Sequence, residues 1–151
     1  MGRDSMNSYN DFTRGTFQNN DYAKQVISFD GLLFRGRNGI SNVTPTDIDG
    51  MVQLDKENCF VIFELKYSGG MPTGQSTALT KLCDAIQAGG ANCVLIVAVH
   101  NTPTPKPIIA KDARVTWAYW NSKWYRETKN RTLYEIAVNF VDFFRRNETS
   151  K

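Results

Sequence analysis

The sequence predicts an α/β fold with a central mixed β-sheet flanked by helices, and three observations support this prediction. Apolar runs of strand length alternate with segments in which apolar residues recur at helical spacing. Residues 60–67 have the pattern of a strand, residues 75–88 that of a helix, and the almost purely apolar residues 92–99 that of a strand covered on both faces. Because a right-handed crossover would join the two strands through the helix, we expect them to be parallel.

Composition is that of an ordinary globular protein. The chain has 151 residues, of which 41% are apolar and 22% are charged, and its net charge of +3 does not by itself indicate a nucleic-acid-binding protein. Its three cysteines are an odd number without CxxC spacing, which is typical of buried thiols in a reducing compartment, so we expect a cytoplasmic location. No apolar run reaches the roughly 18 residues of a membrane span, and no membrane partner is expected.

The N-terminal part of the chain carries the weaker structural signals. Residues 1–19 are polar and are expected to be flexible or loosely ordered, ahead of a single domain at 20–148. Apolar residues at helical spacing predict a short helix at about 20–28. Asn38-Gly39, the strongest short hairpin signal, then separates two strand-like segments.

The helix at 75–88 is expected to bury one apolar stripe and to end at Gly89-Gly90. Asp84 and Gln87 are expected to face solvent. The predicted stripe consists of Ala78, Leu79, Leu82, Ala85 and Ile86.

The C-terminal part predicts a second hairpin and a long helix. Strands at 114–120 and 123–128 flank a two-residue polar turn. Thr132 and Glu135 form a capping box, which predicts a helix that extends to about residue 146.

Two charged side chains lie in the most strand-like segment of the chain. Glu64 and Lys66 interrupt the apolar run at 59–67, where a charge without a partner is costly. Because the side chains of a strand alternate between its faces, we expect Glu64 and Lys66 to share one face. His100, the only histidine, ends a different apolar strand, and we expect it to pack or cap there.

Acidic residues of the preceding strand are the expected partners of this pair. Asp47 and Asp49 share a face of the strand predicted at 47–53, which turns back to pair with the strand that carries Glu64. Two carboxylates that converge in this way suit Mg²⁺, with Mn²⁺ as the alternative, and a lysine beside them orients or deprotonates the water that attacks a phosphodiester. The carbonyl of Leu65 is a further candidate ligand, and either aspartate is able to supply the second carboxylate.

Spacing alone is not specific, because an acidic residue two positions before a lysine is expected about once by chance in a chain of this composition. The same separations occur twice in this chain, in Asp49, Glu64 and Lys66 and again in Asp112, Glu127 and Lys129. The second set lies largely in a polar run just before a helix cap, so we expect Glu127 and Lys129 on a solvated surface.

Three short motifs occur in order: Asp47-Ile48-Asp49-Gly50, Phe63-Glu64-Leu65-Lys66, and Gly74-Gln75 at the start of a helix. Together they resemble the PD-(D/E)XK nuclease superfamily, which includes restriction endonucleases, Holliday-junction resolvases and small phage nucleases. The resemblance covers about residues 30–100 and implies a restriction-endonuclease-like core. It also implies roles for single residues: Asp49 and Glu64 would hold the metal, Lys66 would be the catalytic lysine, and Gln75 would support the site from the helix.

The leading hypothesis is therefore a metal-dependent DNA endonuclease that acts on branched or phage DNA, as a homodimer if its substrate is a two-fold symmetric junction. Basic residues of the two hairpins are the candidate DNA contacts: Arg35, Arg37, Lys123 and Arg126. One alternative is a non-catalytic DNA-binding or protein-interaction domain that retains the nuclease fold and uses the aromatic and basic residues at 111–131. Another is a charge cluster with a structural role alone.

Overall fold

The computed structural model describes residues 34–35, 42–43, 47–68 and 73–148. The chain divides into two compact units, Met1–Pro45 and Thr46–Lys151. The helix predicted at 20–28 lies outside the described residues, and the single domain predicted at 20–148 stays a prediction.

In the first unit, two short strands pair in antiparallel orientation. They are β1 (Phe34–Arg35) and β2 (Asn42–Val43), with Phe34 opposite Val43 and Arg35 opposite Asn42. This register is centred on Asn38-Gly39, the predicted hairpin turn, which itself lies outside the described residues.

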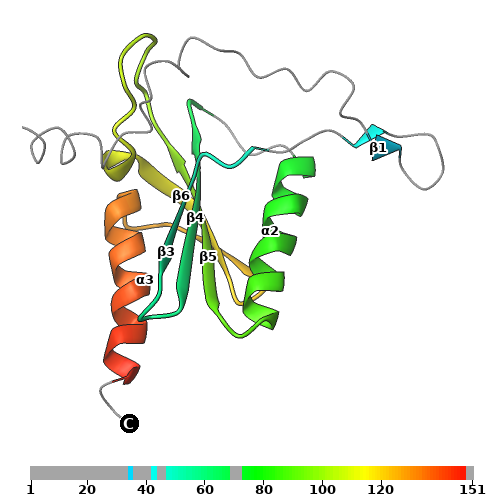
Figure 1. Cartoon of the computed structure of the whole chain (residues 1–151). Coiled ribbons are helices and arrows are strands. Elements are labelled where there is room, and N and C mark those ends of the chain that lie inside the picture. Colours follow the sequence, from blue (N-terminus) through cyan, green and yellow to red (C-terminus); the bar gives the residue numbers. More distant parts are fainter. Residues whose placement is uncertain (1–33, 36–41, 44–46, 69–72, 149–151) are drawn as a thin grey trace, which may run out of the picture. The chain divides into compact units, whose positions relative to one another are not determined.

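The second unit is built on a five-stranded sheet and two long helices (Figure 1). Its elements, in order, are β3 (Gly50–Leu54), β4 (Cys59–Lys66), α2 (Thr73–Ala88), β5 (Asn92–Val99), the 3₁₀ helix η2 (Ala110–Asp112), β6 (Arg114–Trp120), β7 (Lys123–Arg126) and α3 (Leu133–Glu148). The strand order is β3-β4-β5-β6-β7, and only β4 and β5 are parallel to each other among these neighbouring pairs. The predicted α/β class, mixed sheet and parallel pair are thus confirmed.

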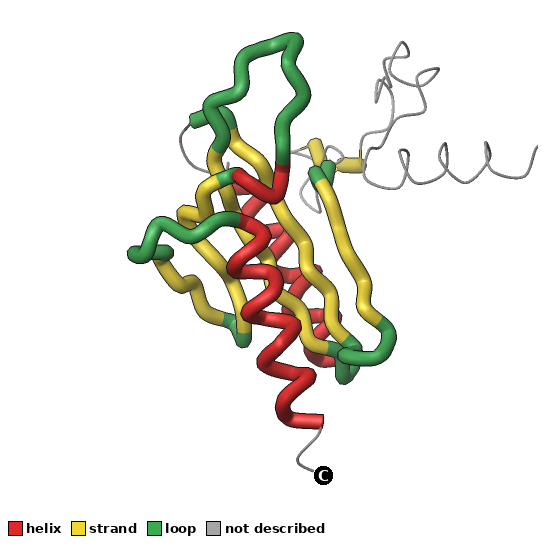
Figure 2. The backbone as a smooth tube through the Cα atoms, turned by 90° about the vertical axis from the view of Figure 1, so that its left-hand side faces the viewer, coloured by secondary structure: helices red, strands yellow, loops and turns green. Residues whose placement is uncertain are grey.

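The two helices cover opposite faces of this sheet (Figure 1), and α3 lies along one of them (Figure 2). One core cluster joins the α3 side of the sheet to residues such as Leu133 and Val141. The other joins Leu79 and Cys83 of α2 to Ile62 and other residues of the sheet. Because successive strand residues alternate between these clusters, each side chain of β4 and β5 faces either α2 or α3.

Helix α3 begins as its capping box predicts. The Oγ of Thr132 accepts a hydrogen bond from the Glu135 amide at 3.2 Å, and a Glu135 carboxylate oxygen accepts one from the Thr132 amide at 2.8 Å. These two bonds satisfy amides that the first helical turn cannot pair within itself. The chain therefore enters α3 in a defined direction, directly after β7.

Helix α2 extends two residues further toward the N-terminus than predicted and ends at the predicted glycine pair. Gly90 has a φ of +96°, and the Ala91 amide donates to the Ile86 carbonyl at 3.3 Å, which is the pattern of a Schellman motif. The predicted apolar stripe is partly wrong, because Leu82 is 37% exposed whereas Cys83 is fully buried. Asp84, expected to face solvent, instead accepts hydrogen bonds from the Tyr119 hydroxyl at 2.9 and 3.0 Å.

The predicted second hairpin is confirmed, with β7 two residues shorter than expected. Asn121 and Ser122 form its turn, and both have positive φ angles, 52° and 60°, as a two-residue hairpin turn requires. The register between β5 and β6 shifts between Val97 and Ala98, so that Val97 pairs with Trp117 and Ala98 with Val115. None of the helices in the described ranges combines the length and the apolar character that crossing a membrane requires.

Candidate active site

The candidate site lies where β4 extends beyond its pairing with β3. That pairing ends at Gly50 and Phe63, so Glu64 and Lys66 continue next to β5 alone. The predicted strand at 47–53 begins later than expected, at Gly50, and Asp47 and Asp49 therefore precede β3 instead of lying in it. Their carboxylates are positioned by the chain that leads into the strand.

Asp49 is held against the backbone of β4. Its Oδ2 accepts a hydrogen bond of 2.6 Å from the amide of Leu65. A strand residue directs its amide and its carbonyl toward the same neighbouring strand, so the Leu65 carbonyl faces the same edge of β4 as Asp49. The aspartate and the carbonyl that the sequence analysis names as metal ligands are thus on one edge.

Gly50 leaves room for the ring of Phe63, a role that was not predicted from the sequence. The ring of Phe63, its partner on β4, occupies the space where a Cβ atom of residue 50 would lie. A larger residue would displace the ring and with it the chain next to Asp49. The signal in the sequence is a glycine directly opposite an aromatic residue, but that pairing is visible only once the register is known.

Lys66 joins Glu64 to α2. Its Nζ donates to a Glu64 carboxylate oxygen at 3.3 Å and to the Oε1 of Gln75, in the first turns of α2, at 2.8 Å. The Nε2 of Gln75 in turn donates to the backbone carbonyl of Asp47 at 3.5 Å. Glu64, Lys66 and Gln75 therefore form one connected set, and Asp47 contacts it through its backbone.

Glu64 is buried without full compensation of its charge. Its side chain is 1% exposed, and one of its oxygens, Oε1, has no hydrogen-bond donor among the described residues. Burial raises the pKa of the Glu64 carboxyl above its ordinary value near 4.5, and the charge of Asp49 raises it further, while Lys66 opposes both effects. A buried oxygen of this kind is rare in proteins, and a bound ion or water would satisfy it.

The described part of the chain contains no group of three or more histidine, cysteine or acidic side chains that would bind a metal. The candidate site has two carboxylates, and a hard divalent cation also accepts carbonyl oxygens and water as ligands. Asp49 and Glu64 supply two carboxylates, Leu65 supplies a carbonyl on the same edge, and Mg²⁺ completes its shell with water. A cation here would give Glu64 Oε1 the partner that it lacks and would offset the repulsion between the two carboxylates.

The two predicted DNA contacts of β7 lie on opposite faces of the sheet. Lys123 is opposite Trp120, whose ring packs against Phe140 of α3, so Lys123 projects on the α3 side. Arg126 is opposite Trp117 and projects on the α2 side with it. The side chains of Arg35 and Arg37 lie outside what the structure describes, so their predicted contacts stay predictions.

Arg126 and Glu64 belong to one row across the sheet. Reading across the strands from β4 to β7, the paired residues are Glu64, Val97, Trp117 and Arg126. Directly paired residues project from the same face, and three steps of about 4.8 Å separate the ends of the row by about 14 Å. An exposed arginine and the 42% exposed Trp117 thus share a face with the candidate site.

The predicted solvated surface of the second acid-and-lysine set is correct for Lys129, which is exposed, and wrong for the side chain of Glu127. The Glu127 side chain is only 3% exposed. Its carboxylate accepts hydrogen bonds from Arg131, at 2.7 and 2.8 Å, and from the Lys129 amide at 2.6 Å. The hydrogen bond from Arg131 lowers the pKa of Glu127 and is the largest contribution to that change. Asp112 forms an exposed pair with Lys111 and has no recorded contact with Glu127.

Comparison with known proteins adds no family to this geometry. No protein-family model matches the chain, and no curated protein or solved structure matches it either.

Proposed function

We propose that this chain is a Mg²⁺-dependent DNA endonuclease with a restriction-endonuclease-like core. The observation that carries the proposal is the buried Glu64 oxygen without a donor, next to Asp49 and within the hydrogen-bonding set of Lys66. A structural charge cluster would be expected to satisfy its buried oxygens internally. The oxygens at this site instead suit a bound cation.

Asp49 and Glu64 would hold the metal, with the Leu65 carbonyl as a further ligand and Asp47 as the alternative carboxylate. When bound, Mg²⁺, or Mn²⁺ in its place, supplies Lewis acidity toward a phosphate oxygen and toward water. Asp49 is oriented for this role by the Leu65 amide, and Glu64 by Lys66.

Lys66 is the proposed catalytic lysine, and Gln75 is its positioning residue. An ammonium group has three N–H donors, and two are directed at Glu64 and Gln75. The third donor is then available to orient the attacking water or to offset negative charge on the phosphate in the transition state. Because Gln75 is on a helix, its hydrogen bond fixes Lys66 relative to the end of β4.

DNA is the proposed partner, on the face of the sheet that α2 covers. Arg126 would contact a phosphate about three strands away from Glu64, and Trp117 offers an exposed aromatic surface between them. We propose branched or phage DNA as the substrate, a cytoplasmic location, and a homodimer for action on a symmetric junction.

The decisive experiment compares cleavage with and without Mg²⁺. Supercoiled, linear and four-way-junction DNA are incubated with the full chain, with Lys66→Ala and, as the matched control, with Lys129→Ala. We expect cutting that requires Mg²⁺, a loss of about 100-fold or more in Lys66→Ala, and no loss in Lys129→Ala. Absence of cutting on all three DNAs, or undiminished cutting by Lys66→Ala, would refute the enzymatic assignment.

The competing proposal, a non-catalytic DNA-binding domain, is favoured by the exposed aromatic residues of β6 and β7, Trp117, Trp124 and Tyr125. It predicts DNA binding that neither needs Mg²⁺ nor leads to cleavage.

A further inference from the structure

The hairpin of β6 and β7 carries aromatic side chains on the face of the sheet that α2 covers. Tyr119 identifies this face, because it belongs to the same core cluster as Cys83 of α2 and its hydroxyl donates to Asp84 of α2. Trp117 lies two residues before Tyr119, and Trp124 is the β7 partner of Tyr119. Both tryptophans therefore project on the α2 side.

The rings of the two tryptophans are in contact and are partly open to solvent. Trp117 and Trp124 meet edge to face, with ring centroids 6.5 Å apart, and Trp124 also meets the ring of Tyr119 at 5.1 Å. Trp117 is 42% exposed and Trp124 is 38% exposed, whereas Tyr119 is buried. The buried tyrosine anchors the pair, and the two tryptophans leave ring surface on which the bases of a single-stranded nucleic acid are able to stack.

Arg126 brings a cation to the same surface. It is the direct partner of Trp117 across β6 and β7, so the two residues project from one face with their Cβ atoms about 5 Å apart. Arg126 is exposed. A guanidinium carries five N–H donors in a planar fork that matches a phosphate. The pairing thus places a phosphate donor directly beside an aromatic surface.

Asp84, the acidic residue of α2 that contacts this face, has both carboxylate oxygens engaged. They accept hydrogen bonds from the Tyr119 hydroxyl, at 2.9 and 3.0 Å, and from the Oγ of Ser122 at 3.1 Å. Ser122 is in the turn of the hairpin, whereas Arg126 is at the opposite end of β7. The anion and the cation therefore lie at opposite ends of the aromatic surface, and a phosphate is favoured at the Arg126 end.

The composition of this surface favours unpaired over paired DNA. Within the paired residues 117–120 and 123–126, the side chains on the α2 side are three aromatic residues and one cation, Arg126. Affinity for a duplex comes largely from several neutralised phosphates, whereas one stacked base raises affinity by about fivefold or more. Both faces of a base inside a duplex are covered by its neighbours, so a tryptophan stacks on a base that is unpaired.

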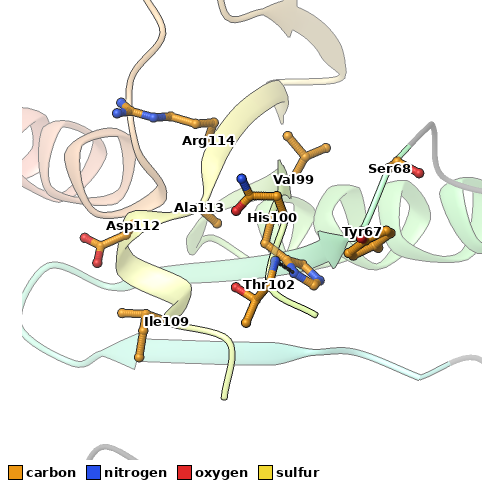
Figure 3. A pocket seen from close by; sticks show the side chains of 10 residues that line it. Tyr67, Ser68, Val99, His100, Thr102, Ile109, Asp112, Ala113 and Arg114 are labelled. Carbon is orange, nitrogen blue, oxygen red and sulfur yellow. Dashed lines mark hydrogen bonds between the residues drawn. The ribbon is translucent and has the colours of Figure 1, made fainter. Parts of the chain in front are cut away.

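The hollow at the carboxyl ends of β4 and β5 has a different arrangement (Figure 3). Tyr67 and His100 meet edge to face there, and the Nδ1 of His100 accepts a hydrogen bond from the Thr102 amide at 3.2 Å, so His100 packs and caps as the sequence predicts. The Arg114 side chain, however, extends away from the two rings, and Asp112 also lines the hollow. Cation and aromatic surface are apart in the hollow, whereas strand pairing brings them together on the hairpin.

The aromatic surface is also in register with the candidate active site. Trp117 and Glu64 belong to one row across the sheet with Val97 between them, so two strand spacings, about 10 Å, separate their backbones. This is about three times the rise per nucleotide of a DNA strand. Nucleotides a few positions from a phosphate at Glu64 are therefore at a suitable distance from the aromatic surface.

We propose that Trp117 and Trp124 stack on unpaired bases of the DNA substrate, with a neighbouring phosphate at Arg126. DNA with a single-stranded segment beside the scissile phosphodiester is then preferred to continuous duplex. This inference rests on the nuclease function proposed above and names the substrate class of the same site.

Binding without Mg²⁺ tests the surface apart from any cleavage. Fluorescence anisotropy gives the affinity of the full chain for three labelled probes of equal length: a single-stranded oligothymidylate, a strand of abasic sites and a blunt duplex. We expect the oligothymidylate to bind about fivefold or more tighter than either of the others, because it alone offers free base faces along its length. Equal affinity for the oligothymidylate and either other probe, or no binding of the oligothymidylate, would overturn the proposal.

Variants give the second part of the test. Trp117→Leu and Trp124→Leu should each weaken oligothymidylate binding by about fivefold or more and leave binding of the abasic strand unchanged. Tyr125→Leu is the matched control, since Tyr125 is 48% exposed and adjoins Trp124 on β7 but is paired with Ala118, which packs on the α3 side. Equal effects of the tryptophan and tyrosine variants would contradict the assignment. Circular dichroism verifies that each variant folds, and the comparison of probes on the parent chain decides the matter if one does not.

The outcome separates this inference from the nuclease proposal. A preference for oligothymidylate that depends on the tryptophans, in a protein that does not cut DNA with Mg²⁺, would support the surface and refute only the nuclease. Mg²⁺-dependent cutting without that preference would refute the surface and leave the nuclease standing. If both hold, Trp124→Leu should raise the KM for a duplex with a splayed single-stranded end more than it lowers kcat.

Discussion

The two acid-and-lysine sets of this chain have the same spacing, and both contain a glutamate with a buried side chain, yet they differ in how the charge of that side chain is compensated. Glu127 accepts hydrogen bonds from the Arg131 guanidinium and the Lys129 amide, and its pKa is lowered. Glu64 has Lys66 at one oxygen and no donor among the described residues at the other, and its pKa is raised. Burial therefore does not distinguish the two glutamates, whereas the missing partner does.

The contacts of Glu127 are those of a structural carboxylate. Glu64 has one oxygen without a donor among the described residues, and this oxygen is able to accept a further ligand. The lysines follow the same division. Lys129 contributes its backbone amide to Glu127, while Lys66 contributes its ammonium to Glu64 and Gln75.

The largest effect on stability is expected from Arg131→Ala. Removal of this guanidinium leaves the Glu127 charge buried without its cation, and we expect the free energy of unfolding to fall by about 2 kcal/mol, less than for a fully buried pair because Arg131 is partly exposed. Urea unfolding measures the change. The control is Lys129→Ala, which retains the backbone amide and should cost less than about 0.5 kcal/mol. Equal losses in the two variants would contradict the structural role of the pair.

Glu64→Gln should have the opposite sign. The substitution keeps the shape of the side chain and removes a buried charge, so without metal we expect the free energy of unfolding to rise by about 1 kcal/mol. Mg²⁺ should raise the melting temperature of the parent chain, because it binds the folded state, and should not raise that of the variant. Thermal unfolding with and without Mg²⁺ provides both measurements. A variant that is less stable without metal, or equally stabilised by Mg²⁺, would count against the metal site.

The two glutamates should also have opposite effects on the pH dependence of stability. The raised pKa of Glu64 means that the folded state binds its proton more tightly than the unfolded state, so the contribution of Glu64 is most favourable below its ordinary value near 4.5 and is lost as pH rises through the folded pKa. The lowered pKa of Glu127 stabilises the fold above that ordinary value, and this contribution is lost as pH falls through the folded pKa.

Unfolding of the parent, Glu64→Gln and Glu127→Gln is therefore measured in metal-free buffer from acidic to neutral pH. Relative to the parent, Glu64→Gln should become more stable as pH rises, and Glu127→Gln should become less stable. If the stabilities of the two variants changed with pH in the same direction, the opposite pKa shifts of Glu64 and Glu127 would be refuted.

The smallest effect is expected on DNA affinity. Arg126 shares a face with Glu64, whereas Lys123, on the same strand, projects to the other side. In the Lys66→Ala background, Arg126→Ala should reduce the slope of log affinity against log salt by about one, the value for one phosphate contact, and Lys123→Ala should leave it unchanged. Fluorescence anisotropy over a salt series measures the slope. A reduction in the Lys123 variant alone would place the DNA on the α3 face.

Much of the fold follows from local signals in the sequence. The capping box at Thr132, the turn between β6 and β7 and the glycine pair after α2 are confirmed because each depends on only a few neighbouring residues. The alternation that places Glu64 and Lys66 on one face is local as well, since it follows from the strand itself. Local signals predicted the ends of the strands less well, and β3, predicted to start at residue 47, starts at Gly50.

The sequence by itself determined that charges would interrupt an apolar strand and that a helix would follow within reach of them. Only the tertiary structure decided which charges lack partners. The burial of Glu127, the bonding of Asp84 to Tyr119 and the placement of Arg126 on the α2 side and Lys123 on the α3 side depend on strand register and on helices that arrive from distant parts of the chain. Contacts between residues far apart in the sequence do not appear as a periodic pattern along the chain. They depend on which strands pair and in which register, and the residues next to them along either strand do not determine this.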